Sequence, residues 1–206
     1  MFHALNEPTE LFAAKLYAII EVPRFDDTDR VRASHIAVSM SLEHWDATRN
    51  LLESGLLPSA LVVHRAQFEA LVRSVWLFYA ASDVMISKLL TTLSPDSEQA
   101  AKNLPQTAVM MAELSIKAPP QAYDALNRFK ENSWKALNSY AHAGIHPLRR
   151  HEEGYSVDLL NSVLRNSNGL AVVAGMQTAV LSGRQPLVKE VLAIALAHPS
   201  CMPPPI

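Results

Sequence analysis

Residues 58–81 read PSALVVHRAQFEALVRSVWLFYAA, with a proline at the first position and no glycine or second proline after it. Apolar side chains recur along this stretch at helical spacing, and Leu61, Phe68, Val72 and Val75 share one face. Proline suits the first turn of a helix because its missing N–H would have no partner there. The stretch therefore predicts a core helix. No segment of the chain shows the two-residue alternation typical of a strand.

Similar helix signals occur on both sides of this stretch. Prolines and capping residues stand before apolar runs, and glycines follow them. We expect helices over residues 6–22, 28–54, 58–81, 96–116 with a break near Pro105, 121–143, 157–182 and 186–197, with residues 82–93 continuing or kinking the third. The predicted fold is an all-α, single-domain bundle of six to seven helices over residues 1–206, in which residues 198–206 form a frayed Pro-rich tail.

Composition excludes several classes of protein. The chain has 206 residues, 49% of them hydrophobic, and a net charge of −2, which argues against a broad DNA-binding footprint. The single cysteine, Cys201, rules out a disulfide framework within the chain. The N-terminus lacks a basic segment followed by an apolar core, and the most apolar stretch, residues 169–181, is too short to span a bilayer. We expect a cytoplasmic protein that does not engage membranes.

Two charged residues interrupt the apolar pattern of residues 58–81. Arg65 occupies a position in the apolar stripe, and Glu69 follows one turn later. An ion pair in this order along a helix contributes only ~0.2–0.5 kcal/mol, whereas an unpartnered charge facing a core is far more costly. Both side chains are therefore expected to reach groups on neighbouring helices, either as a structural network or as a ligand-binding or catalytic pair.

Residues 139–147 read SYAHAGIHP and end the helix predicted over residues 121–143. Lys135, Asn138 and His142 lie on one polar stripe of that helix. Gly144 is expected to take the left-handed position after the helix, and Pro147 to prevent its continuation. This segment is a helix end by one interpretation and, by another, an anion site.

The second interpretation depends on how many polar groups follow one another here. Helix termination requires no such cluster, so these side chains are candidates for holding an anionic ligand. We expect this segment and the Arg65–Glu69 pair to converge in space. The candidate ligand-binding residues are Ser139, Tyr140, His146, Arg149 and Arg150.

A long helix ending in Asn-Ser-Tyr-Ala-His-Ala-Gly, in an all-helical chain of this size, resembles the HEPN superfamily of prokaryotic helical domains. In HEPN ribonucleases an arginine and a histidine, a few residues apart and usually with a polar residue between them, assist attack of the RNA 2′-hydroxyl on phosphate in a cleft shared by two protomers. Asn138 and His142 match part of that pattern, while Leu137 occupies the position of the arginine and Lys135 is the nearest cation.

Apolar residues occupy many helix faces, among them Trp45, Trp76, Met110 and Met111, so we expect an exposed apolar patch that a homodimer buries. The resemblance implies that such a homodimer acts on RNA or in a bacterial defence or toxin system. Its candidate catalytic residues are His142 as acid or base, Lys135 or Arg65 as phosphate clamp, with Asn138 and Glu69 beside them. The alternative is a non-catalytic helical interaction module in which the same residues are structural, so the chain is not assigned as an enzyme from sequence. His142 and His146 have zinc-ligand spacing but lack the glutamate of a His-Glu-x-x-His site, and we expect neither metal nor cofactor.

Overall fold

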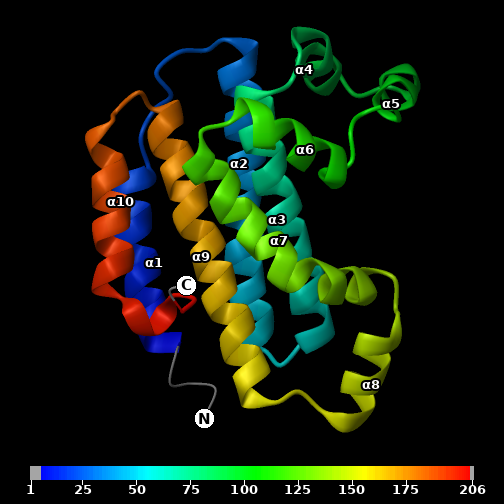
Figure 1. The fold of residues 1–206 in the computed structure, drawn as a ribbon, viewed down its shortest axis with the longest axis vertical. Coiled ribbons are helices and arrows are strands. Elements are labelled where there is room, and N and C mark those ends of the chain that lie inside the picture. The colour runs from blue at the N-terminus through cyan, green and yellow to red at the C-terminus, as the bar shows by residue number, and fades with distance from the viewer. Residues whose placement is uncertain (1–5, 205–206) are drawn as a thin grey trace.

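The structure, a computed structural model, describes residues 6–204. In that range all regular secondary structure is helical, which confirms the all-α prediction (Figure 1). The predicted number of six to seven helices is wrong, because the described residues form ten α-helices and a short 3-10 turn. They are α1 (Asn6–Ile20), α2 (Asp29–Glu53), α3 (Leu57–Tyr79), α4 (Asp83–Leu90), α5 (Pro95–Ala101), α6 (Thr107–Lys117), α7 (Pro120–Ala141), α8 (Ile145–Glu153), α9 (Val157–Leu181), α10 (Pro186–Ala197) and η2 (Pro199–Cys201).

Two predicted segments are divided by serine caps and by proline. The Ser82 hydroxyl accepts the backbone N–H of Met85, so α4 begins as a separate helix and does not continue α3. Residues 94–117 contain α5 and α6, with a capping box at Ser94 and Ser97 and the break at Pro105. Local capping thus creates short helices where apolar periodicity alone indicated longer ones.

Helix α8 is absent from the sequence prediction. We expected Pro147 to prevent further helix, yet it is the third residue of α8. The first four N–H groups of any helix lack intrahelical acceptors, so a proline in this turn removes no hydrogen bond. The same proline that follows α7 is therefore compatible with the start of the next helix.

Several helix ends agree with the prediction. The Ser156 hydroxyl accepts the backbone N–H of Leu159 and starts α9, and α10 has the predicted bounds. Gly55 adopts φ +73°, a conformation that favours glycine, directly after α2. Thr28 holds the cap position of α2, and Asp27 before it pairs with Arg24.

Helices α2 and α3 form the most extensive pair, and α9 packs against both. Helix α7 lies across α3, while α1 and α10 lie together on the far side of α9 (Figure 1). Helices α4 to α6 gather at one end of the bundle, and α8 lies at the other end (Figure 1). This arrangement leaves α3 bordered by α2, α6 and α7, which builds the candidate site described below.

The residues that suggested an exposed apolar surface are buried. Trp45, Trp76, Met110 and Met111 are each at most 2% exposed and belong to the core. Apolar side chains on many helix faces thus find partners inside one chain, because ten helices provide more internal faces than six. These four residues no longer support the expectation of a homodimer.

Two buried amides connect the central helices. Gln67 of α3 donates to the backbone oxygen of Ser167 in α9 at 2.9 Å and accepts the Ser167 hydroxyl at 2.7 Å. Asn168, the next residue of α9, accepts the indole N–H of Trp45 in α2 at 2.9 Å. Because buried polar groups are costly unless paired, these bonds determine how α9 sits on the α2–α3 pair.

The expected fraying of residues 198–206 does not hold for the part that the structure describes. Cys201 is fully buried, and its backbone oxygen accepts a hydrogen bond from the Asn168 side chain at 3.1 Å. The Ser200 backbone oxygen accepts one from Arg165 at 3.0 Å. The tail is therefore attached to α9 as far as Pro203, which lies against Gly169, and residues 205 and 206 lie outside the described range.

No helix in residues 6–204 combines the length and the apolar character needed to cross a membrane.

Candidate functional site

An open cavity of about 900 Å³ lies beside α3, bordered by α2, α6, α7 and the loop that precedes α6. We call it the arginine cavity. Four of the candidate residues line it: Arg65 and Glu69 from α3, and Asn138 and His142 from the end of α7. The structure thus brings together the two segments that the sequence predicted to converge, over a separation of about 70 residues in the chain.

Arg65 contacts one residue of its own helix and one of α7. Its guanidinium pairs with Glu69 at 3.0 Å and lies over the ring of Trp134 in α7, 5.0 Å from the ring centroid. The hydroxyl of Thr107 in α6 lies 3.5 Å from the same Glu69 oxygen. Both charged side chains do reach neighbouring helices, as expected, while also forming the ion pair along α3. Because they are only partly buried, the pair contributes little stability.

Arg73 lies one turn beyond Glu69 on α3 and, unlike Arg65, forms no ion pair with a carboxylate among residues 6–204. Its guanidinium is 5.8 Å from the ring centroid of Trp76, whose N–H donates to Glu113. One terminal nitrogen of Arg73 is buried without a hydrogen-bond partner in the described part of the chain. Burial lowers the pKa of Arg73, and the charge of Glu69 opposes that shift in part. Arg73 therefore lines the cavity with a guanidinium that is not neutralised by an ion pair among the described residues.

The charged groups on the cavity wall are mostly basic. Arg65 and Arg73 carry positive charges against the single carboxylate of Glu69, and two histidines, His44 of α2 and His142, also line the wall. His44 is half-buried and His142 is exposed. The cavity wall therefore carries more basic than acidic side chains, which favours an anionic ligand.

The end of α7 differs from the predicted geometry. Ala143, with φ +49°, takes the left-handed position that we expected for Gly144. Gly144 follows it, and its N–H donates to the Ser139 backbone oxygen at 2.8 Å. A Cβ on Gly144 would lie 2.6 Å from the Ser139 hydroxyl oxygen, so this glycine permits close approach. That hydroxyl accepts the His146 backbone N–H at 3.1 Å and so supports the start of α8.

The remaining candidates lie away from the arginine cavity. Lys135 is exposed and not part of the cavity wall. Tyr140 is buried near Tyr155, and burial above all raises its pKa. On α8, His146 is exposed and Arg149 pairs with Glu152 at 2.7 Å and with Glu153, so Arg149 already has anionic partners. None of the described contacts connects these side chains, or Arg150, to the cavity.

Three cavity residues were missed from the sequence: Arg73, His44 and Trp134. Arg65, Glu69 and Arg73 follow one another at intervals of four, and this spacing could have identified Arg73. Trp134 precedes Asn138 and His142 at the same interval along α7. No local signal identifies His44, because its place depends on how α2 packs against α3.

The position of the HEPN arginine is occupied by a core residue. Leu137 is 3% exposed and belongs to the larger apolar core, so its side chain points away from the cavity wall. An arginine at this position would have to leave that core to reach a ligand. Among the described residues, no cluster of three or more His, Cys, Asp or Glu side chains is arranged to hold a metal ion.

A family model described as a family of unknown function, DUF6988, matches residues 38–204, and the chain therefore belongs to this family. The match includes every cavity residue except Ala37. No curated protein shows a significant match to the chain, and no solved structure does so.

Proposed function

We propose that this member of the DUF6988 family binds single-stranded RNA through the arginine cavity. The observation that carries the proposal is Arg73, whose partly buried guanidinium keeps a nitrogen without a partner beside a second arginine. A desolvated cation is costly unless an anion pairs with it. A phosphate group offers several acceptor oxygens and suits the planar fork of an arginine.

Arg65 and Arg73 are assigned to phosphates about two nucleotides apart along one RNA strand. They are two turns apart on α3, about 12 Å by the rise of an α-helix, a separation of the order of two nucleotides in an extended strand. Trp134 and Glu69 hold the Arg65 guanidinium in place and reduce the conformational entropy lost on binding. Lys135 is not needed as a phosphate clamp, because Arg73 supplies that charge from the cavity wall.

RNA cleavage would require a base and an acid in addition to the phosphate clamp. His142 lies at the exposed side of the cavity and His44 at its α2 wall, so the two imidazoles are available for these roles. One takes the proton of the 2′-hydroxyl as its oxygen attacks phosphorus, and the other protonates the departing 5′-oxygen. The products are a 2′,3′-cyclic phosphate and a free 5′-hydroxyl, and Asn138 can orient a phosphate oxygen.

The binding test compares two arginine variants with the same loss of charge. A fluorescein-labelled RNA of 12 nucleotides is titrated with the parent, with Arg73→Gln and with Arg32→Gln, whose exposed arginine pairs with Asp29 outside the cavity. We expect Arg73→Gln to weaken binding by about tenfold or more, as for a lost charge-assisted contact. The slope of log K against the logarithm of the salt concentration should become less steep by about 0.7, the value for one phosphate contact on a single strand. Fluorescence anisotropy measures both quantities.

Arg32→Gln is expected to bind RNA nearly as the parent does. The midpoint of thermal unfolding of Arg73→Gln should equal that of the parent, because the guanidinium that it loses is partly desolvated. If RNA binding weakens equally in the two variants, the loss of affinity follows from net charge alone, and the assignment of RNA binding to the cavity is wrong. Absence of RNA binding by the parent at 50 mM salt would remove the proposal altogether. Product analysis on the same RNA decides cleavage: His142→Ala should still bind but release no cyclic phosphate.

The second candidate is a non-catalytic interaction module. Leu137 favours it, because a core leucine stands where the HEPN arginine would act. In this case the Arg65–Glu69–Trp134 contacts maintain the register of α3 against α7, and the cavity binds an acidic segment of a partner protein. If the parent protein binds RNA without cleaving it, the RNA-binding proposal stands and ribonuclease activity is excluded. If the parent binds no RNA, the interaction module is the candidate that is left.

The homodimer is retained as a proposal on different residues from those first considered. Ile145 and Leu148 lie three residues apart on α8 and are 71% and 65% exposed. A second copy of the chain would bury them in a symmetric contact. We expect a parent dimer in sedimentation velocity at tens of micromolar, and a monomer for Leu148→Glu. A monomeric parent of about 23 kDa would refute the dimer and with it the two-protomer cleft of the HEPN resemblance.

A further inference from the structure

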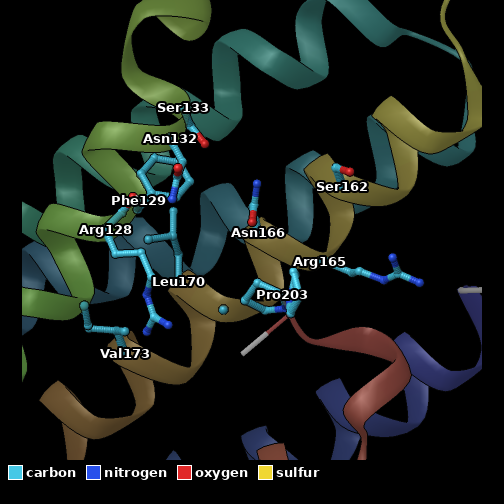
Figure 2. A pocket seen from close by; sticks show the side chains of 13 residues that line it. Arg128, Phe129, Asn132, Ser133, Ser162, Arg165, Asn166, Leu170, Val173 and Pro203 are labelled. Atoms are coloured by element: carbon cyan, nitrogen blue, oxygen red, sulfur yellow. Dashed lines mark hydrogen bonds between the residues drawn. The ribbon is translucent and has the colours of Figure 1, made fainter. Parts of the chain in front are cut away.

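A second pocket, of about 460 Å³, lies between α7, α9 and the C-terminal segment (Figure 2). We call it the tail pocket, because Pro203 and Pro204 form one of its walls. It shares no lining residue with the arginine cavity. The RNA proposal therefore does not account for it, and the two sites can be tested independently.

The wall formed by the tail is fixed in place. Pro203 packs against α9 so closely that a Cβ on Gly169 would lie 3.0 Å from its ring. Just before it, the backbone oxygens of Ser200 and Cys201 accept hydrogen bonds from Arg165 and Asn168 of α9. The pocket therefore exists before any ligand binds, which lowers the entropic cost of binding.

The pocket combines an apolar floor with hydrogen-bonding groups. Phe129 and Leu170 are buried, and Val173 and Pro203 extend the same apolar surface. The Asn132 and Asn166 amides project between α7 and α9, and Ser133 and Ser162 add hydroxyls nearby (Figure 2). A ligand that fits this lining has an apolar body and a polar end.

The charge of the pocket identifies that polar end. Its two ionisable side chains are Arg128 and Arg165, and no acidic residue lines it. Figure 2 shows the two guanidinium groups at opposite sides of the pocket, and Arg165 is already bonded to Ser200. Arg128 is exposed and belongs to none of the ion pairs formed among residues 6–204. One available guanidinium suits one negative charge, and its fork matches a carboxylate.

We propose that the tail pocket binds a small organic carboxylate with an apolar body. Its carboxylate pairs with Arg128, and its apolar part lies over Phe129 and Leu170 against the ring of Pro203. The Asn132 amide nitrogen already donates to the Arg128 backbone oxygen at 2.9 Å, and its amide oxygen accepts a hydrogen bond from the ligand. Asn166 donates to polar groups of the ligand or accepts from them. Because Pro203 is part of the wall, ligand binding also strengthens the attachment of the tail to α9.

Octanoate and octanamide serve as probes, since they share one alkyl chain and differ in charge. Each is titrated into ¹⁵N-labelled protein, and amide shifts are followed by NMR. We expect saturable shifts at residues 128–133 and 165–173 with octanoate, and at least tenfold weaker binding of octanamide. Arg128→Gln should reduce octanoate affinity about tenfold and leave octanamide affinity unchanged. Gly169→Ala should weaken both probes, because the added methyl group displaces Pro203.

Arg32→Gln provides the charge-matched control and should bind both probes as the parent does. The proposal is overturned by equal affinity for the two probes, by an Arg128→Gln variant that binds octanoate like the parent, or by shifts confined to residues 65–73 of the arginine cavity. Nonspecific association, with shifts that grow linearly and never saturate, overturns it as well. RNA binding by Arg128→Gln is measured in parallel, so that loss of one site is distinguished from loss of the other.

Discussion

Replacing Asn168 by alanine is expected to lower the free energy of unfolding by about 4 kcal/mol, the cost of leaving several buried polar groups without partners. The Asn168 side chain is fully buried and joins four segments of the chain. It accepts the Trp45 indole N–H at 2.9 Å and donates to the Thr9 hydroxyl at 3.2 Å and the Cys201 backbone oxygen at 3.1 Å. Urea unfolding followed by circular dichroism measures the loss.

The matched control is Asn166→Ala, two residues earlier on the same helix. The Asn166 side chain is half-buried at the edge of the tail pocket and makes no hydrogen bond within residues 6–204. Its replacement is expected to change the free energy of unfolding by at most about 0.5 kcal/mol. If the two alanine variants unfold at the same urea concentration, Asn168 does not hold α1, α2, α9 and the tail together.

Lowering the pH from 7 to 4 is expected to cost about 3 kcal/mol of stability through one residue, His64. Its imidazole is 1% exposed, meets the ring of Phe129 edge-on and donates through Nδ1 to the Gln67 side-chain oxygen at 3.0 Å. Burial lowers the pKa of His64 to about 4, and the hydrogen bond to Gln67 opposes that shift in part.

The sign of the effect follows from proton binding. Between the ordinary histidine pKa of 6.5 and the folded value of about 4, the unfolded chain binds a proton that the folded chain excludes. Stability therefore falls as the pH drops through this range, and it levels off below about pH 4. The measurement is the urea midpoint at steps between pH 4 and 8, for the parent and for His64→Gln.

The glutamine of His64→Gln does not titrate. The free energy of unfolding of this variant should therefore fall by about 3 kcal/mol less than that of the parent between pH 7 and pH 4. Other groups, such as His35, whose pKa burial also lowers, titrate in both proteins and cancel in the comparison. Parallel pH profiles for the two proteins would show that His64 is accessible to solvent protons and that the buried Gln67–His64 contact does not form.

Local sequence determined where most helices begin and end. Ser156 started α9 and Pro186 started α10 because a hydroxyl acceptor and a missing N–H satisfy the first turn of a helix without help from the rest of the chain. The same local information was insufficient at Pro147, which is compatible with both a loop and the first turn of α8. Helix number was therefore less predictable than helix type.

Half of the candidate site followed from local reasoning. Arg65 and Glu69 stood out because they interrupt an apolar stripe, and Asn138 and His142 because they line a polar stripe at a helix end. Lys135 was chosen for its position along α7 alone, yet it lies outside the cavity. The spacing of charged residues along α3 also indicates Arg73, which the sequence prediction did not include.

The sequence by itself determined that this chain is helical, where its principal helices lie, and which polar residues packing alone does not explain. Only the tertiary structure decided that α2 and α6 complete the arginine cavity with His44 and Thr107, and that Pro203 closes a pocket on α9. The physical reason is the distance along the chain over which each kind of interaction acts. Capping and periodicity act within about four residues along a helix, whereas these contacts join segments whose approach is set by the packing of the whole core.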